Sequence, residues 1–391
     1  MNTLSVYHSV ESVVRQRHSH HPTVGLLSTY APTFCGLASF SASLSDGLRA
    51  LGADVGIVRV ADDVASTGDG VVGEVVSGSA PSLAACSELL NQHDVAIIQH
   101  EYGIYGGRDG DEVLAILDGL RVPSVVVAHT VLKNPTTGQR SVMEEVAAKA
   151  DHVVVMSEAA HRVLRSSFHV DDAKISVIPH GATMPHGGPP KRSGRPIVLT
   201  WGLIGPGKGI ERVIDAMPAL VDIPGRPKYV VAGRTHPKVL ANEGESYREA
   251  LLDRARRNGV ADAVHLDDGY RSMASRTALI RSAAVIALPY DSTDQATSGV
   301  LVDAIAGGRP IVATAFPHAV ELLSTGAGIV VDHDDPAAMA SALHRVLTQP
   351  RLAGDMAGEA RQLAPTMAWP VVADSYLRLA KRAISARPAL V

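Results

Sequence analysis

The chain has 391 residues, of which 46% are hydrophobic and 19% are charged. This length suggests two or three domains, and so much apolar material excludes a mostly disordered chain. The 36 Lys and Arg residues against 40 Asp and Glu residues give a net charge of −4, which argues against a protein that works on nucleic acid or on anionic lipid.

Cysteine usage and hydropathy predict a cytoplasmic protein. The two cysteines, Cys35 and Cys86, do not form a C-x-x-C pair, so we expect neither a disulfide framework nor a zinc–thiolate site. No apolar run approaches about 18 residues, and the N-terminus lacks the basic-then-apolar order of a signal peptide. We therefore expect no transmembrane segment, whereas peripheral contact with a membrane stays open.

Residues 1–21 have no hydrophobic period and are expected to form an N-terminal tail. His18, His20 and His21 lie close together there, which admits a metal site as the alternative to a solvated tail. We favour the tail because no Cys or carboxylate ligand set accompanies the three histidines.

Short apolar strands alternate with amphipathic helices over residues 22–181. Near-continuous apolar runs are typical of strands that are buried on both faces of a parallel sheet. The strands that we predict are Val24–Leu27, Val55–Val60, Val95–Ile98, Ser124–Ala128, Val153–Met156 and Ile175–Ile178. This alternation indicates right-handed crossovers and a Rossmann-like, doubly wound α/β domain.

The same alternation restarts after a Gly- and Pro-rich stretch, residues 182–195, which we assign to an interdomain linker. The strands predicted for the second domain, residues 196–368, are Ile197–Thr200, Tyr229–Ala232, Val264–Leu266, Val285–Leu288, Ile311–Thr314 and Ile329–Val331. Residues 369–391 carry a final amphipathic helix, which either packs on its own domain or crosses back to the first. Ligands of open α/β sheets bind beyond the carboxyl ends of the strands, so we expect the site in the cleft between the domains.

A glycine-rich turn, Trp201–Gly209, connects the first strand of the second domain to a helix whose apolar residues recur from Ile210 to Val221. The backbone N–H groups and the helix dipole favour an anion at such a turn, and Lys208 adds a full charge. The spacing from Gly202 to Lys208 fits a P-loop, but a P-loop needs Ser or Thr next, where this chain has Gly209. We therefore favour another kind of phosphate site over a nucleoside triphosphatase.

A second polar loop, after the fourth strand of the second domain, leads into another helix through Thr297, Ser298 and Gly299. Helix capping alone would explain Thr297 or Ser298. Yet this helix start lies at the same edge of the sheet as Lys208, and the two together suit a diphosphate. Asp303, one to two turns into the helix, is placed to accept hydrogen bonds from sugar hydroxyls.

Two Asp-x-Asp patterns, Asp109–Asp111 and Asp332–Asp334, are reminiscent of metal-binding pairs. Each precedes a helix, so we interpret both as helix capping. We accordingly predict no metal and no other cofactor.

From about Thr23 to Ser385 the sequence resembles the retaining glycosyltransferases of the GT-B fold, and among them glycosyltransferase family 4. The family's motifs occur in order: IPHGA at Ile178–Ala182 for I-P-N-G-V, a Lys-Gly turn at Lys208–Gly209, and AIAGGRPIVAT for A-x-A-x-G-x-P-V-V-A. A strand-end His of the family has its counterpart in His129. The resemblance implies two Rossmann-like domains that face each other across a cleft, the first for the acceptor and the second for a nucleotide sugar.

Two positions depart from the family pattern. The Glu-x7-Glu motif is represented by Gln295 and Asp303, and an Arg that often follows the domain-opening strand is Leu203 here. The resemblance implies that the first acidic position contacts the donor sugar and the second the ribose, roles that Gln and Asp can still fill. Arg234 is our candidate to meet phosphate charge in place of the missing Arg.

These patterns and the resemblance together predict the site residues. We expect catalytic roles for His129, Lys208 and Gln295, and acceptor contacts for His100, Glu101 and Tyr102. The residues expected to bind the donor are Gly36, Gly207, Gly209, Arg234, Thr297, Ser298, Gly299 and Asp303.

The expected function is that of a hexosyltransferase. The resemblance implies transfer of a hexose from a nucleotide sugar, of GDP-mannose or UDP-glucose type, with retention and an α-linkage. The acceptor, which the sequence does not identify, is a glycan, a glycolipid or a small molecule. Two alternatives stay open: a non-catalytic GT-B protein that binds sugar nucleotides, and a GT-B sugar-nucleotide epimerase.

Overall fold

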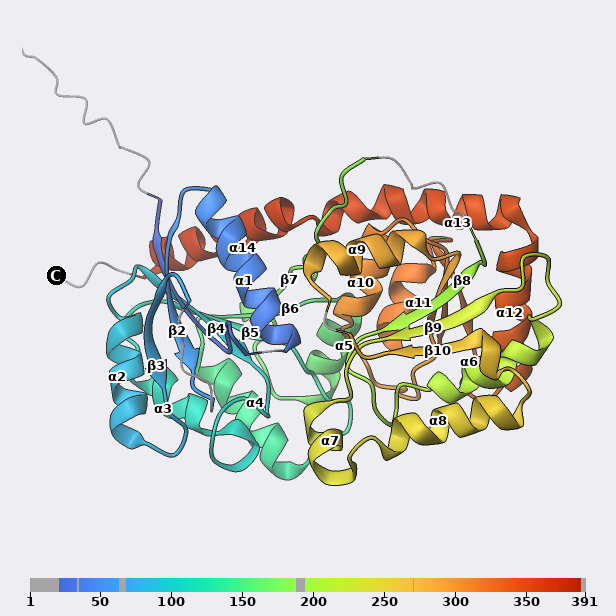
Figure 1. The fold of residues 1–391 in the computed structure, drawn as a ribbon. Helices are drawn as coiled ribbons and strands as arrows, with labels where there is room; N and C mark the ends of the chain where they lie inside the picture. The colour runs from blue at the N-terminus through green and yellow to red at the C-terminus, as the bar shows by residue number, and fades with distance from the viewer. Residues whose placement is uncertain (1–20, 34, 63–67, 188–193, 270, 388–391) are drawn as a thin grey trace, which may run out of the picture.

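The computed structural model describes residues 21–33, 35–62, 68–187, 194–269 and 271–387, which form two α/β domains side by side (Figure 1). Of the three tail histidines only His21 falls within these ranges; His18 and His20 lie outside the described residues, as do residues 188–193 of the predicted linker. Among the helices so described, none is long and apolar enough to cross a membrane.

The first domain is built on a parallel sheet of seven strands in the order β3-β2-β1-β4-β5-β6-β7. The strands are β1 (Thr23–Ser28), β2 (Asp54–Val60), β3 (Val71–Val75), β4 (Val95–His100), β5 (Ser124–Ala128), β6 (His152–Val155) and β7 (Ile175–Val177). Its α-helices are α1 (Gly36–Ala50), α2 (Ala80–Leu90), α3 (Glu112–Asp118), α4 (Thr137–Lys149) and α5 (Glu158–Ser167). Every residue of β4 and β5 is buried, which explains their apolar runs Val95–Ile98 and Val125–Ala128.

The second domain has a parallel sheet of six strands in the order β10-β9-β8-β11-β12-β13. The strands are β8 (Ile197–Trp201), β9 (Lys228–Ala232), β10 (Val264–Asp267), β11 (Val285–Leu288), β12 (Ile311–Thr314) and β13 (Gly328–Val331). The α-helices of this half are α6 (Ile210–Ala216), α7 (Pro237–Glu243), α8 (Ser246–Arg257), α9 (Met273–Ser282), α10 (Gly299–Ala306), α11 (Pro317–Leu323), α12 (Pro336–Thr348) and α13 (Pro350–Leu363). Strand order reverses between β1 and β4 and between β8 and β11, and such switch points are where open α/β sheets bind ligands.

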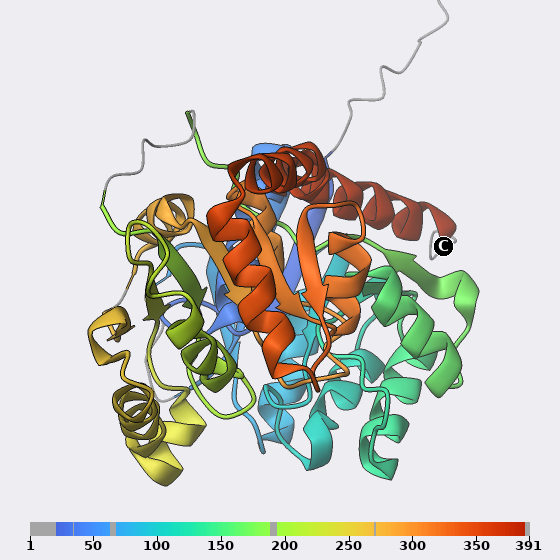
Figure 2. The ribbon, with the colours of Figure 1, turned by 90° about the vertical axis from the view of Figure 1, so that its right-hand side faces the viewer.

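The C-terminal helix, α14 (Trp369–Ala386), crosses from the second domain to the first. The red helices α13 and α14 run along the top of the molecule in both ribbon views (Figures 1 and 2). Val372 and Tyr376 of α14 are buried in one apolar cluster with Leu44 and Leu48 of α1. The C-terminal helix therefore packs on the first domain, a question that the helical pattern in the sequence left open.

The structure differs from the sequence-based expectations in three local details. Strand β3 was not expected, because it is an edge strand of mixed exposure interrupted by Gly73. The regular helix α6 ends at Ala216 and gives way to a 3-10 turn that contains Pro218, whose ring nitrogen has no hydrogen to donate. Neither Asp-x-Asp pattern caps its helix: Asp335 caps α12, while Asp111 accepts from the Arg108 N–H over 3.1 Å.

Candidate active site at the domain junction

The glycine-rich turn and the polar loop of the second domain meet because β8 and β11 are neighbours in the sheet. The Asp291 N–H donates to the Gly207 carbonyl oxygen over 3.0 Å. Gly209 has a φ of 61°, and a Cβ there would collide with the carbonyl oxygen of Pro289, so no other residue fits. A Cβ on Gly207 would meet no atom within 4 Å, so the turn is open on that side.

Lys208 is connected to the start of α10 through one aromatic ring. Its Nζ lies 4.8 Å from the centre of the Tyr290 ring, a cation–π distance. The Tyr290 hydroxyl is hydrogen-bonded to Ser298, the N-cap residue of α10. Burial lowers the pKa of the Lys208 ammonium, and a bound anion would act in the opposite direction because it favours the charged form.

The N-terminus of α10 is capped by Ser298, one of the two residues predicted for that role. Its Oγ accepts the Leu301 N–H over 3.2 Å, and its own N–H donates to His318 Nδ1 over 2.9 Å. Burial lowers the pKa of His318 to about 3, which keeps its imidazole neutral and able to accept. The remaining first-turn amides, from Gly299 on, are of the kind that can bind an anion at a helix N-terminus.

Gln295 supports the loop ahead of α10. Its side-chain Nε2 donates to the Thr297 carbonyl oxygen over 3.2 Å, and its backbone carbonyl oxygen accepts the backbone N–H of His318 over 3.3 Å. A carboxylate at this position has no hydrogen to donate to Thr297. Gln295, which replaces the acidic residue of the family, therefore makes a hydrogen bond to Thr297 that the acidic residue could not make.

Asp303 lies in a small cavity at the other side of α10, shared with Arg276, Thr183 and Met273. Its carboxylate is 3.7 Å from Arg276 Nε. Burial raises the pKa of Asp303 to about 6, although the Arg276 charge acts in the opposite direction. The side chain is thus more enclosed than a helix-surface carboxylate, and a ligand in this cavity would meet both charges.

His129 of the first domain, directly after β5, is held in one tautomer. Its ring lies edge-on to Phe40, with 4.8 Å between ring centres. Its Nε2–H donates to Gln99 Oε1 over 2.6 Å, because an amide oxygen can only accept. Burial and the neighbouring histidines His180 and His100 lower the pKa of His129 to about 3. The imidazole is therefore neutral, and Nδ1 is its hydrogen-bond acceptor.

His180 connects His129 to the second domain. Phe40 is edge-on to His180 as well, with ring centres 5.0 Å apart. On its other side, His180 Nε2 lies 2.8 Å from where a Cβ on Gly299 would stand, so only glycine lets the ring approach the start of α10. Nearby, Ser157 Oγ donates to the Ala296 carbonyl oxygen over 2.5 Å. These contacts bring the predicted residues of both domains to one junction.

The predicted acceptor residues differ in accessibility. His100 has no exposed surface, since it is the last residue of β4 and packs edge-on against Tyr102, so the predicted direct contact with an acceptor is wrong. Glu101 is half-buried and accepts a hydrogen bond from Thr130 Oγ1. Burial raises the pKa of Glu101, and the charge of Lys238 from α7 acts against that rise. Glu101 therefore lies where the two domains approach each other.

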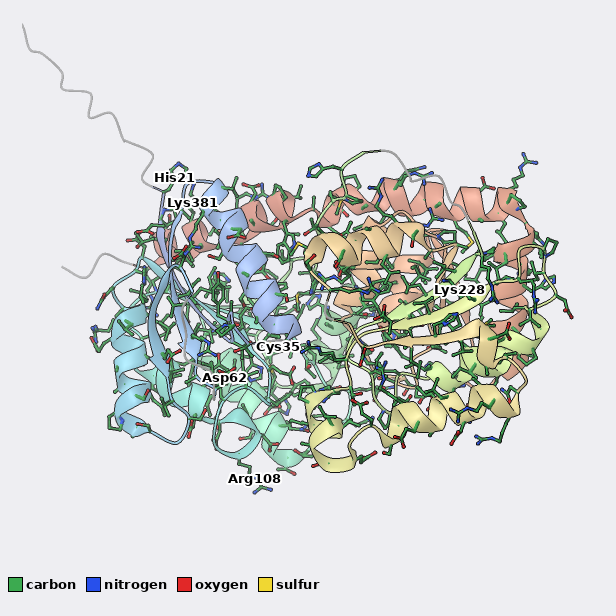
Figure 3. All side chains as sticks on the ribbon, viewed as in Figure 1. His21, Cys35, Asp62, Arg108, Lys228 and Lys381 are labelled. Carbon is green, nitrogen blue, oxygen red and sulfur yellow. The ribbon has the colours of Figure 1, made fainter. Side chains whose placement is uncertain are left out.

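Two further residues that were predicted to bind the donor substrate lie at the edges of the junction. Gly36 is the exposed first residue of α1, and Figure 3 labels the adjacent Cys35 at the end of α1 that faces the second domain. Arg234 follows β9 with an exposed side chain, and its carbonyl oxygen accepts the Ile204 N–H over 2.8 Å. Within the described ranges, no group of three or more His, Cys, Asp or Glu side chains is placed to hold a metal ion.

Sequence reasoning missed the residues that position the predicted ones. Gln99 orients His129, Tyr290 connects Lys208 to α10, and His318 binds the Ser298 amide. Arg276 faces Asp303 from α9. Gln99 and Tyr290 carried a detectable signal, since each is a polar residue at the end of an apolar run, but their partners are set by strand order.

Two family models match the chain, one in each domain. The model described as Glycosyltransferase Family 4 matches residues 35–183, and the model described as Glycosyl transferases group 1 matches residues 195–349. Together they cover most of the chain and divide where the two sheets divide.

Among curated proteins, the chain is similar to D-inositol 3-phosphate glycosyltransferases. It is 27% identical over 248 residues to that of Nocardiopsis dassonvillei, covering 60% of this chain and 56% of the relative. It is 28% identical over 282 residues to that of Actinosynnema mirum, covering 66% of each. The matched region thus spans less than two thirds of these relatives' length.

Solved structures share the fold. Sucrose-phosphate synthase from Thermosynechococcus elongatus superimposes with a TM-score of 0.75 at 16% identity, covering 93% of this chain and 100% of that one. Anabaena HepE in complex with UDP and glucose gives a TM-score of 0.73 at 15% identity, with 93% and 100% covered. At these identities the likeness shows a two-domain GT-B arrangement.

Proposed function

The chain belongs to the GT-B glycosyltransferases of family 4 type, and from this we propose that it transfers a hexose from a nucleotide sugar to an acceptor hydroxyl, with retention and an α-linkage. The family models in both domains support sugar transfer. The relatives are named for a glycosyltransfer involving inositol 3-phosphate, and HepE was solved with UDP and with UDP-glucose. From that similarity we propose a UDP- or GDP-linked hexose as the donor substrate of this chain.

The observation that carries this proposal is the shared position of Lys208 and the α10 N-terminus. The Tyr290 ring contacts Lys208, and its hydroxyl is hydrogen-bonded to Ser298, which caps α10. The Lys208 cation and the α10 dipole therefore act at one point. This point lies at the switch of the second sheet, between β8 and β11. A diphosphate placed there would meet two sources of positive potential. Asp303, on the same helix, would then accept hydrogen bonds from the ribose hydroxyls.

Catalysis in this arrangement consists of departure of the nucleoside diphosphate. Negative charge grows on its oxygens in the transition state, and Lys208 with the α10 amides stabilises that charge without a general acid. His129, neutral and fixed by Gln99, presents Nδ1 to a hydroxyl of the donor sugar. Gln295 lies on the loop beside the leaving group and adds no charge there. We propose that the reaction requires no divalent metal, because these groups already oppose the developing charge.

The reaction is proposed to take place in the cytoplasm. The two cysteines are free thiols, Cys35 half-buried and Cys86 buried, which suits a reducing compartment.

The proposal is tested by incubating the protein with UDP-, GDP- and ADP-hexoses and measuring nucleoside diphosphate release with and without a panel of acceptors. We expect a thermal shift with one nucleoside diphosphate and turnover that depends on an acceptor, with an α-anomeric product by NMR. Turnover of the sugar nucleotide without an acceptor would favour the epimerase, and binding without turnover would favour a non-catalytic protein.

A further inference from the structure

A groove runs along the domain junction beside the proposed active site, with a volume of about 630 Å³. Its first-domain wall includes Lys133, Arg162, Arg165 and Ser166, and its second-domain wall includes Thr293 and Asp294. Ligand sites of small molecules occupy about 300–1,000 Å³, so a mono- or disaccharide fits this junction groove.

The junction groove has an excess of positive charge. Three cationic side chains line it against one carboxylate, Asp294. Arg162 is 3.9 Å from Glu321, but both oxygens of that carboxylate already accept backbone N–H groups at the start of α5, over 3.0 and 2.6 Å. The guanidinium therefore has only a distant, shared counter-charge.

The other two cations are also available to a ligand. Arg165 Nε is 3.3 Å from Asp172, whose same oxygen accepts from His161 Nε2 over 2.9 Å. Lys133 is exposed and has no ion-pair partner among the described residues. An anion in the junction groove would thus gain charge-assisted hydrogen bonds from Lys133 and Arg162 without displacing a close ion pair, while Arg165 would share its guanidinium with Asp172.

The junction groove adjoins the residues proposed to act on the donor sugar. Lys133 lies on the loop that follows β5 and begins with His129. Asp294 directly precedes Gln295, so their Cα atoms are about 3.8 Å apart. The groove therefore lies next to loop residues proposed to act on the donor sugar, whereas Lys208 and Asp303 lie outside its lining.

We propose that the junction groove is the acceptor site and that it selects an acceptor with an anionic group, a phosphate ester or a carboxylate, through Lys133, Arg162 and Arg165. This inference rests on the proposed function and adds the chemical class of the acceptor. Two arginines and a lysine around one pocket form the donor set that planar or tetrahedral anions prefer. The apolar wall from α5 would contact the ring of the acceptor.

The test uses three probes with the same pyranose ring: glucose 6-phosphate, glucuronate and glucose. Their binding to the full chain is measured by calorimetry at low salt, where charge pairs are least screened. We expect at least one anionic probe to bind about tenfold or more tightly than glucose, the ratio expected of one charge-assisted hydrogen bond. If glucose 6-phosphate binds more tightly than glucuronate, the acceptor class is a phosphate ester. If the two anionic probes bind equally tightly, acidic sugars belong to the acceptor class as well. Equal binding of all three, or none, overturns the inference.

Variants assign the anion to the groove. The double substitution Arg162→Gln and Arg165→Gln should reduce the preference to less than about twofold, while Arg351→Gln on the exposed surface of α13 should preserve it. The nucleoside diphosphate thermal shift of the double variant shows that it is folded. Loss of the anion preference in Lys208→Ala but not in the double variant would place the anion at the donor site and overturn the inference. Because no donor is needed, the result is separate from failure of the proposed transfer.

Discussion

The two domains contribute opposite kinds of chemistry to their junction. Beside the proposed donor sugar the first domain presents neutral histidines, since burial lowers the pKa of His129 to about 3 and that of His180 to about 4; its cations Lys133, Arg162 and Arg165 line the separate junction groove. The second domain presents charge and backbone dipoles: Lys208, the α10 N-terminus and the Asp303 carboxylate. Both sets lie beyond the ends of strands, so the difference arises in the loops and the helix start that follow the strands.

This division suits a reaction that separates charge. The departing diphosphate becomes more negative and is met by the second domain, while positive charge grows at the sugar carbon. A protonated histidine there would oppose that positive charge at short range. The low pKa of His129 prevents such protonation, and its bond to Gln99 fixes the orientation of the ring. The comparison predicts that charge changes in the second domain matter most.

The largest effect is expected for Lys208→Ala. Removing a group that stabilises transition-state charge lowers kcat by about 10²–10³, and the affinity for nucleoside diphosphate should fall as well. Steady-state kinetics measures kcat and calorimetry measures the affinity. Lys381→Ala, on the exposed face of α14, is the matched control. Kinetics close to wild type in Lys208→Ala would break the assignment of leaving-group charge to the second domain.

A smaller loss is expected for Gln295→Glu. The carboxylate cannot donate to the Thr297 carbonyl and adds negative charge beside a departing anion, which should cost about 10- to 100-fold in kcat/KM. Gln295→Ala loses the same hydrogen bond without adding charge and should be less impaired. An increase above wild type in Gln295→Glu would instead identify this position as a damaged catalytic position.

The sequence could predict the elements and the residues at their ends, but not the contacts between them. Lys208, Ser298, His129 and Asp303 follow from glycine turns, helix starts and a family motif, all of which are local in the chain. Their partners Gln99, Tyr290 and Arg276 come from other elements, and only strand order and helix packing bring them together.

His100 shows why the end of a strand is hard to read. The sequence predicts a strand that ends at Ile98 and an acceptor contact for His100, whereas β4 continues through His100 and turns its ring into the core. Both of its ring nitrogens lack a hydrogen-bond partner in the described structure, and burial lowers the pKa of His100 to about 4. A polar side chain near the end of a predicted strand therefore does not show whether the side chain points into the core or toward a ligand.

A modest, pH-dependent effect is expected at Asp303. Only the ionised carboxylate accepts two ribose hydrogen bonds, and the pKa of Asp303 lies at about 6. The donor kcat/KM, which reports the free enzyme, should thus fall as pH drops through 6, by roughly tenfold at pH 5. Asp303→Asn should lower the donor kcat/KM at pH 7.5 by about tenfold and remove this step. A step of the same size in the variant would assign it to another group.

The smallest effect is expected from removing metal ions. Glycosyl transfer needs positive charge near the departing diphosphate, and the comparison assigns that charge to Lys208 and α10 of the second domain. Dialysis against EDTA should therefore leave kcat unchanged within about twofold, and added Mg²⁺ or Mn²⁺ should have a similarly small effect. The same dialysis applied to Lys208→Ala sharpens the test, because a metal could replace a missing cation there while leaving the wild type unaffected. Complete loss of wild-type turnover in EDTA, restored by either metal, would mean that the second domain does not supply enough positive charge by itself.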